Sequence, residues 1–411
     1  MSSAARAEAM AGKALPRPVP SWVRVLAWLG VAVGAVALAV GLRSSDPAPA
    51  WRALLVNFLF WVSLGQGALV WAAVFRVTRT SWSAPVNRVA HSASRFLPVC
   101  LLAFAALIAG RRYLLPWLGT EVGDRAFWLN WRSLFLRDGL GLLLLTALSW
   151  AFVRTYLRAD AGPTEEGAAA DRRLSVLGVA LLFGYGVVFS LLGFDLVMSL
   201  AWGARTELAG GRGPIPWYST LLGWHFVVSS LYLGIAWLVM LSVLLRDWLG
   251  VRDGIATTHL RHLGNLMLAF AMAMTYFLYS QALPIWYENL PPETSFAITR
   301  IHHHPWQALC WVLLFTCYLG VFALLVVREM KEKPAALLAV SLVVLASMWL
   351  ERYMLVVPSL APRATGFPLL AALIAIGFLG ALVLTTARFL ARHPAVSPLD
   401  LALAKERENW P

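Results

Sequence analysis

The chain has 411 residues, of which 60% are hydrophobic and 13% are charged, whereas roughly a quarter of the residues in a soluble protein are charged. Apolar stretches follow one another so closely that no room is left for a soluble domain, so the composition predicts a polytopic membrane protein. The net charge of +13 comes from basic residues at the ends of apolar runs, a pattern typical of contact with lipid headgroups and not of nucleic-acid binding.

Ten apolar segments of about 20 residues or more are long enough to cross a bilayer as helices. They cover residues 22 to 42, 51 to 75, 96 to 117, 132 to 154, 174 to 200, 218 to 245, 262 to 287, 303 to 327, 335 to 358 and 366 to 391. The sequence therefore predicts an all-α integral membrane protein with ten transmembrane helices. The first segment is too long and too far into the chain for a typical signal peptide, so we expect it to remain as a helix.

The basic residues divide unequally between the two sides of this layout. Of the 34 Lys and Arg residues, 22 lie on the side that holds both tails and 12 on the other side. Because cytoplasmic loops carry the excess of basic residues, both termini are predicted to be cytoplasmic. The loop between the third and fourth segments opposes this trend, since Arg111, Arg112, Arg125, Arg132 and Arg137 are counted with it.

Several spans carry polar residues at a common depth. This depth is about 9 to 11 Å below the membrane boundary on the side away from the two termini. They are Asp138, Asp195, His225, Gln281 and the Glu351–Arg352 pair, with Asn57 at a similar depth in the second span. An ionisable side chain inside a span costs at least about 2.5 to 3.5 kcal/mol, so each marks a candidate site. We expect Asp195, His225, Gln281, Glu351 and Arg352 to line one connected polar cavity.

A purely structural role is the alternative for these residues. Glu351 or Arg352 could then form an ion pair with Asp195 or Asp138 that only joins two helices. His225, Ser229 and Tyr232 follow one another on a single helical face. The cytoplasmic half of the bundle is expected to be poorer in polar groups, with Tyr185 and Asn265 as its main candidates.

The histidines and cysteines predict no metal centre in this chain. Transmembrane haem requires two histidines on facing helices, and His225 is the one that lies well inside a predicted span. We interpret the run from His302 to His304 as solvated residues before Pro305, with a transition-metal site as the alternative. The cysteines form no C-x-x-C pair for an iron-sulfur cluster and no haem attachment motif. Phosphate-binding, zinc-protease and serine-hydrolase motifs are also absent, so an autonomous enzyme is not expected.

Four segments in order carry a family resemblance. They are FDLVMSL at Phe194 to Leu200, WYSTLLGWHF at Trp217 to Phe226, YSQALPIWYENLPPE at Tyr279 to Glu293 and ERYMLVVPS at Glu351 to Ser359. With NFLFWVSLGQG at Asn57 to Gly67, the sequence resembles the F subunit of bacterial alternative complex III from the second span through the ninth. That complex is a quinol:cytochrome c oxidoreductase, and its F subunit belongs with the polysulfide-reductase membrane anchors, the NrfD-like proteins.

The resemblance implies an organisation and a set of partners. After a tail (1–21) and a first helix (22–50), it implies two four-helix bundles (51–200 and 201–358), then a last helix and tail (359–411). It implies a place in the bacterial inner membrane beside a homologous quinol-binding subunit, an iron-sulfur subunit, c-type cytochrome subunits and a terminal oxidase. The clusters and haems belong to those partners, and this chain would hold quinone or quinol at most, with no covalently bound cofactor.

The quinone-binding or proton-relay residues expected from depth and resemblance together are Asp138, Asp195, His225, Tyr279, Gln281, Glu288, Glu351 and Arg352. In this sequence Pro292 stands where a second acid often follows the Leu-Pro pair, which leaves Glu293 alone and weakens an acidic relay in that loop. Two alternatives stay open, a secondary transporter and a structural scaffold for the quinol-binding subunit. Transporters bind near the midplane on broken helices, whereas these polar groups lie off-centre and the prolines lie mainly at span ends.

Overall fold

A computed structural model describes residues 17–161, 167–202, 217–251, 255–364, 368–397 and 399–400. Within these residues it contains ten helical spans long and apolar enough to cross a membrane, and no strand. The spans are α2 (Ser21–Arg43), α3 (Ala48–Val77), α4 with α5 (Ala84–Ser92 and Leu97–Ala109), α7 (Trp131–Ala161), α8 (Gly167–Leu196), α9 (Leu222–Leu244), α10 (Thr257–Glu288), α12 with α13 (Trp306–Leu313 and Gly320–Val326), α15 (Pro334–Leu360) and α16 (Leu369–Leu390). The predicted all-α membrane fold is confirmed. The Gly- and Pro-rich residues 203–216 lie outside the described residues.

The third span differs from its predicted position. It begins at Ala84 and ends at Ala109, whereas hydropathy predicted residues 96 to 117. The reason is that α4 carries polar side chains such as Arg88 and His91 that are buried inside the protein, where other protein groups replace lipid as their surroundings. A hydropathy pattern assigns such residues to a loop, although the helix continues through them.

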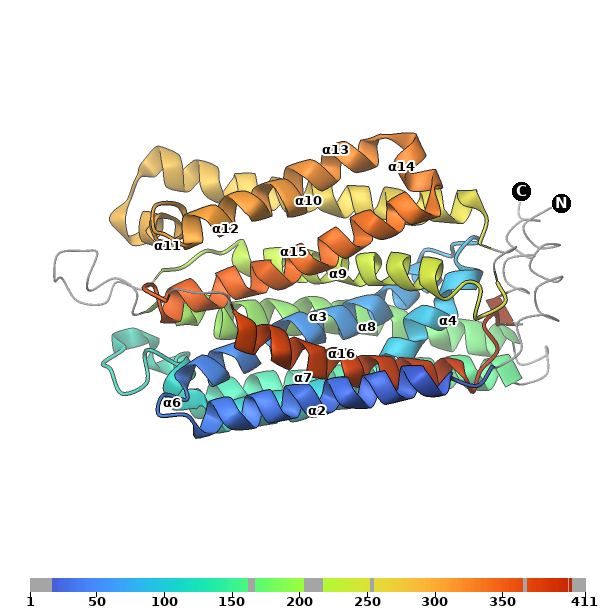
Figure 1. The fold of residues 1–411 in the computed structure, drawn as a ribbon, viewed down its shortest axis with the longest axis horizontal. Coiled ribbons are helices and arrows are strands. Elements are labelled where there is room, and N and C mark those ends of the chain that lie inside the picture. Colours follow the sequence, from blue (N-terminus) through green and yellow to red (C-terminus); the bar gives the residue numbers. More distant parts are fainter. Residues whose placement is uncertain are drawn as a thin grey trace.

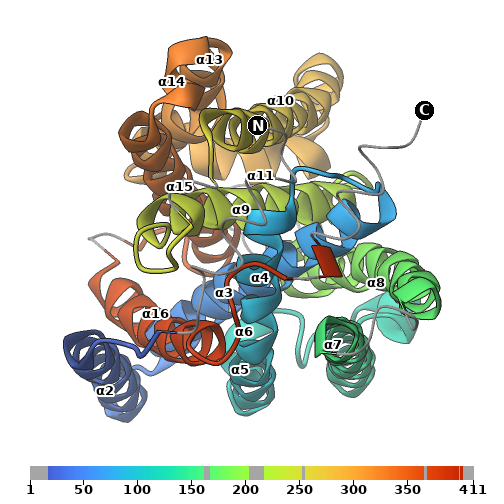
Figure 2. The same cartoon turned by 90° about the vertical axis from the view of Figure 1, so that its right-hand side faces the viewer.

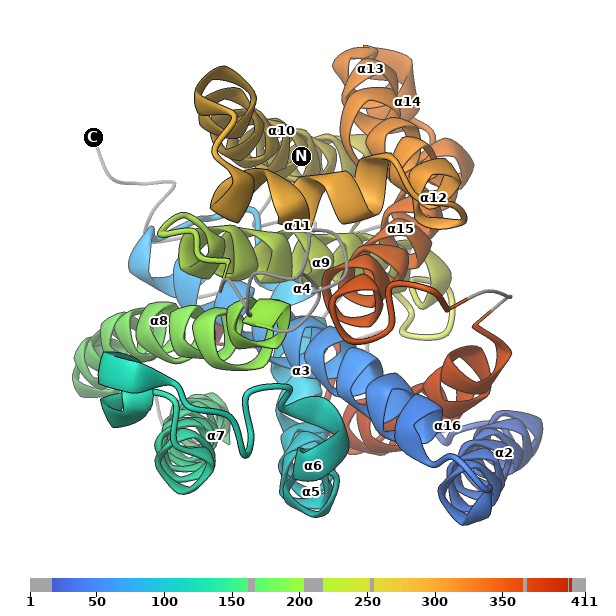
Figure 3. The same cartoon turned by 90° about the vertical axis from the view of Figure 1, so that its left-hand side faces the viewer.

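The spans lie roughly along one axis, as Figure 1 shows. We call the end where α2 begins and α16 ends the tail end, and the opposite end the distal end. The short helix α11 (Pro291–Ile301) lies across the distal end (Figure 3). Seen from the tail end, α3 and α9 occupy the centre and α2 lies at the edge beside α16 (Figure 2).

The two central helices, α3 and α9, approach each other closely at a pair of glycines. A Cβ atom on Gly67 would lie 2.2 Å from the carbonyl oxygen of Ser230, and one on Gly234 would lie 2.4 Å from the carbonyl carbon of Gly67. One turn earlier, the Ser230 hydroxyl donates to the Ser63 hydroxyl at 2.9 Å. Small residues allow membrane helices to pack closely. The division into two four-helix bundles, which α3 and α9 would begin, stays a prediction.

The close approach makes a testable prediction about Gly67. Replacing it by alanine should destabilise the folded chain by about 1–3 kcal/mol, because the added methyl forces α3 and α9 apart. Gly186 of α8 is the matched control, since a Cβ there meets no atom within 4 Å. Unfolding of both variants in mixed detergent micelles would measure the difference. Equal stability of Gly67→Ala and Gly186→Ala would contradict the packing described.

Arg300 of α11 fixes the distal end of α15. Pro358 has no N–H, so the Met354 carbonyl loses its donor within the helix. Arg300 replaces that donor, because its Nε donates to the Met354 oxygen at 2.8 Å and its Nη2 donates to Leu355 O and Ser359 Oγ at 3.0 and 2.9 Å. A cation near a helix C-terminus also interacts favourably with the helix dipole. These bonds hold the helix that carries two of the predicted site residues.

Candidate functional site

A buried ion-pair network joins α9 to α15 in the distal half of the bundle. His225 Nε2 lies 2.9 Å from Glu351 Oε1, and Arg352 Nη1 donates to Glu351 Oε2 at 2.5 Å. Arg352 Nη2 also donates to Ser229 Oγ at 2.8 Å, and its guanidinium carbon lies 4.3 Å from the ring centroid of Phe226. We call His225, Ser229, Glu351 and Arg352 the Glu351 network, and all four are buried.

The helices explain how the Glu351 network forms. His225 and Ser229 are four residues apart, a spacing that predicts one helical face, and both contact side chains of α15. Glu351 and Arg352 are neighbours that leave the helix in different directions, yet the long Arg352 side chain reaches the carboxylate. The structure pairs Glu351 with His225 and Arg352, and not with Asp195 or Asp138, the partners considered in the structural alternative.

A π-helical turn borders the Glu351 network. Residues Leu314–Leu319 form this turn between α12 and α13, and the Tyr232 hydroxyl donates to the Cys317 carbonyl there at 3.4 Å. Gly320 is required at its end, because a Cβ atom would lie 2.2 Å from Phe315 O. Turns of this kind occur frequently at functional sites, and the sequence pattern gave no signal of this one.

A second network lies between α7 and α8, in which the two carboxyl groups are buried, Arg137 is partly buried and Trp128 is exposed. Asp195 Oδ2 accepts from Arg137 Nε at 2.7 Å, and Arg137 Nη2 lies 2.5 Å from the same oxygen. Asp195 Oδ1 accepts from the indole N–H of Trp128 at 2.8 Å. The Arg137 guanidinium also lies 4.0 Å from the Trp128 ring centroid. We call Trp128, Arg137, Asp138 and Asp195 the Asp195 network.

Asp138 brings a second carboxyl into the Asp195 network. It is buried and lies next to Asp195, with which it shares a side-chain hydrogen bond. The single guanidinium of Arg137 thus interacts electrostatically with two carboxyl groups. Two interacting carboxyls titrate as a pair, so this arrangement can hold one exchangeable proton.

An aromatic pocket of about 560 Å³ opens beside Asp195 at the distal end. Trp128 lines the pocket and donates to Asp195, and Ser199 lines it and donates to the Asp195 carbonyl oxygen at 2.6 Å. Its other lining residues are Asp124, Arg125, Phe127, Leu129, Phe194, Met198, Trp202, Trp217, Tyr218, Ser219 and Thr220. Pockets of 300–1,000 Å³ with mostly apolar walls and a few polar groups are typical ligand sites. The aromatic walls and few polar groups of this pocket suit a flat ring with polar edges.

The predicted site residues fall into separate places. The structure joins His225, Glu351 and Arg352, and it joins Asp138 with Asp195. Among the described residues no hydrogen bond or ion pair connects these two sets. The structure brings Gln281 near the aromatic pocket, 3.5 Å from the Ser219 hydroxyl.

Three other polar candidates lie away from both networks. The side chains of Tyr279 and Glu288 are exposed on α10, and 61% of Tyr279 is accessible. Asn57 instead joins α3 to α16, because its amide donates to the Ala371 carbonyl at 2.9 Å. The quinone-binding or proton-relay role of the predicted residues stays a prediction.

The tail half contains a polar network that the sequence reasoning missed. Arg88 of α4 forms an ion pair with Asp160 at the end of α7, and it donates to the Pro394 carbonyl at 3.0 Å. The Tyr156 hydroxyl donates to Asp400 at 2.6 Å, and burial raises the pKa of the Asp400 carboxyl. The expectation that this half is poor in polar groups is therefore wrong. The segment after α16 folds back and brings these partners together from distant parts of the sequence.

Trp128 and Arg137 were also missed as site residues, because the positive-inside count placed Arg137 among loop residues. Its position directly before Asp138, inside the predicted span 132–154, was the available signal. A scan against protein-family models and a search of curated proteins each found no match to this chain. The family resemblance therefore stays a prediction carried by the quoted segments.

Proposed function

We propose that the chain is a non-haem integral membrane subunit of a respiratory quinol:acceptor oxidoreductase, in which the aromatic pocket binds the quinol ring. The observation that carries this proposal is the bond from Trp128 to Asp195, because it joins a ring-sized pocket to a buried carboxyl pair. The resemblance to the F subunit of alternative complex III supports the substrate class. It also supplies the partners, which are an iron-sulfur subunit, c-type cytochromes and a homologous quinol-binding subunit.

The chemistry of the site suits quinol oxidation, which releases electrons and protons together. Electrons leave to clusters or haems of the partner subunits. Protons need a nearby acceptor, and the Asp138–Asp195 pair offers one in which Arg137 compensates a single negative charge. Trp202 and Trp217 wall the pocket with apolar surface. This subunit's part is therefore to position the ring and to accept or pass on a proton.

A secondary transporter is the rival proposal, and the geometry gives it less support. Transporters place their substrate near the midplane on discontinuous helices. The central helices α3 and α9 are continuous through their length, and the aromatic pocket opens at the distal end. The Glu351 network joins α9 to α15 through its ion pairs, so we assign it to helix association.

Purification from the native membrane in mild detergent tests the proposal. Under these conditions the chain should bring with it an iron-sulfur protein and a c-type cytochrome, identified by mass spectrometry and by haem absorption. Washing at high salt serves as the control for adventitious cytochromes, since a subunit interface of ordinary size should survive it. A chain that purifies alone, without redox proteins, would overturn the proposal and favour the transporter.

A further inference from the structure

The contact between α2 and α16 leaves a groove on either side of a tight crossing. A Cβ atom on Gly34 would lie 2.5 Å from Gly377 Cα, and one on Gly380 would lie 2.3 Å from Ala27 O. The backbones therefore touch at this point. Toward each end of the bundle the two helices leave a groove, of about 640 Å³ at the tail end and about 700 Å³ toward the distal end.

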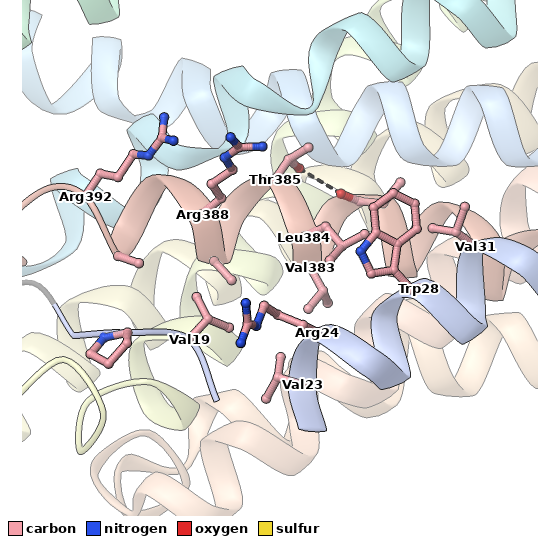
Figure 4. A pocket seen from close by; sticks show the side chains of 14 residues that line it. Val19, Val23, Arg24, Trp28, Val31, Val383, Leu384, Thr385, Arg388 and Arg392 are labelled. Carbon is pink, nitrogen blue, oxygen red and sulfur yellow. Dashed lines mark hydrogen bonds between the residues drawn. The ribbon is translucent and has the colours of Figure 1, made fainter. Parts of the chain in front are cut away.

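The tail-end groove is basic. Arg24, Arg388 and Arg392 line it with apolar side chains such as Val23 and Trp28, and no acidic residue is among its described lining residues. In Figure 4 the Arg24 side chain lies between α2 and α16, whereas Arg388 and Arg392 project from the end of α16 on the side away from Arg24. Within the described part of the chain, none of these three guanidinium groups forms an ion pair.

The distal groove differs in charge although it is similar in size. Leu29, Val33, Val36 and Leu373 are among its lining residues, and Asp46 is the charged residue among those described. Both grooves offer an apolar surface of the kind that acyl chains cover. The tail-end groove alone combines such a surface with positive charge at the level of a helix end, where lipid headgroups lie.

We propose that the tail-end groove binds an anionic phospholipid, with its phosphate on Arg24 and its acyl chains along Val23 and Trp28. Arg388 and Arg392 contribute to the positive potential around the headgroup. Basic pockets between transmembrane helices bind anionic headgroups in this way. A zwitterionic lipid fits less well, because its ammonium group would meet arginines and no described carboxylate. The proposal does not depend on the quinol chemistry of the distal end.

Lipid exchange on the full-length chain tests this site. The chain is reconstituted in nanodiscs that contain phosphatidylglycerol and phosphatidylcholine with identical acyl chains, and the lipids retained after transfer to mild detergent are counted by native mass spectrometry. Each Lys or Arg near the surface adds about 1 kcal/mol of attraction for anionic lipid, which corresponds to about fivefold in binding. Arg24→Gln should therefore lower the preference for phosphatidylglycerol about fivefold, and the double variant Arg388→Gln/Arg392→Gln should lower it as well.

The matched control is Arg43→Gln, which removes an exposed arginine from the other end of the same helix. It should lower the lipid preference much less than Arg24→Gln does, because Arg43 lines neither groove. Glycerol phosphate, which has the headgroup chemistry without acyl chains, should not displace the retained lipid at millimolar concentration. Equal preference in Arg24→Gln and Arg43→Gln, no preference in the unmodified chain, or displacement by glycerol phosphate would each overturn the proposal.

Discussion

Replacing Arg352 by methionine should lower the free energy of unfolding by about 3–5 kcal/mol, the cost of leaving one partner of a buried ion pair alone. Glu351 would keep His225 Nε2 at 2.9 Å, but it would lose the guanidinium that lies 2.5 Å away. Ser229 would lose its charged partner too. In the low-dielectric interior no water replaces these bonds, so we expect less folded protein and a poorly assembled complex.

Two further variants make this experiment decisive. The double variant Glu351→Leu/Arg352→Met removes both charges and should recover most of the lost stability, because apolar replacement of a whole buried pair is often close to neutral. Arg328→Gln is the matched control, since it breaks an exposed pair with Glu332 on the short helix α14 (Arg328–Glu332), worth less than about 1 kcal/mol. If Arg352→Met is as stable as Arg328→Gln, the ion pair between Glu351 and Arg352 does not stabilise the fold, and the proposed role is refuted.

Replacing Asp138 by asparagine should slow quinol oxidation by about 100-fold, the lower end of the range typical of a lost acid–base group, while the complex stays assembled. The shape is kept, and the Arg137–Asp195 ion pair is untouched. The substitution removes the second carboxyl of the pair, the one that lies beside Asp195. Steady-state turnover with a soluble quinol would measure the effect, and co-purification of the redox subunits would report assembly.

Asp195→Asn should behave differently, because it leaves the Arg137 guanidinium without its carboxylate partner. We expect that variant to lose assembly together with activity. Asp46→Asn is the control for Asp138→Asn, since Asp46 is an exposed acid in the loop before α3 at the same end of the bundle. If Asp138→Asn and Asp46→Asn oxidise quinol at the same rate, the carboxyl pair has no part in the reaction.

The sequence predicts the spans well because apolar length alone decides whether a helix can cross a bilayer. It misplaces the third span because Arg88 finds a buried partner in Asp160, and hydropathy does not register a partner 72 residues away. The helical face of His225 and Ser229 follows from local periodicity and is therefore predictable.

The sequence does not determine which cation forms an ion pair with which carboxylate. Several cations and carboxylates lie at similar depth, so depth cannot decide that Glu351 pairs with His225 across 126 residues or that Asp195 pairs with Arg137. The aromatic pocket is built from three separate stretches around Trp128, Met198 and Ser219. No single stretch carries its signature, because the cavity exists only once the helix ends are packed together.

A photoreactive quinone offers the most direct test of quinol binding in the aromatic pocket. Irradiation of the purified complex, followed by peptide mapping of this chain, should place the label within residues 124–129, 194–202 or 217–220, the segments that line the pocket. An excess of unlabelled quinol should abolish that label, and Trp128→Ala should weaken it. Labelling confined to other subunits, or spread over the lipid-facing helices of this chain without competition by quinol, would contradict quinol binding in this pocket.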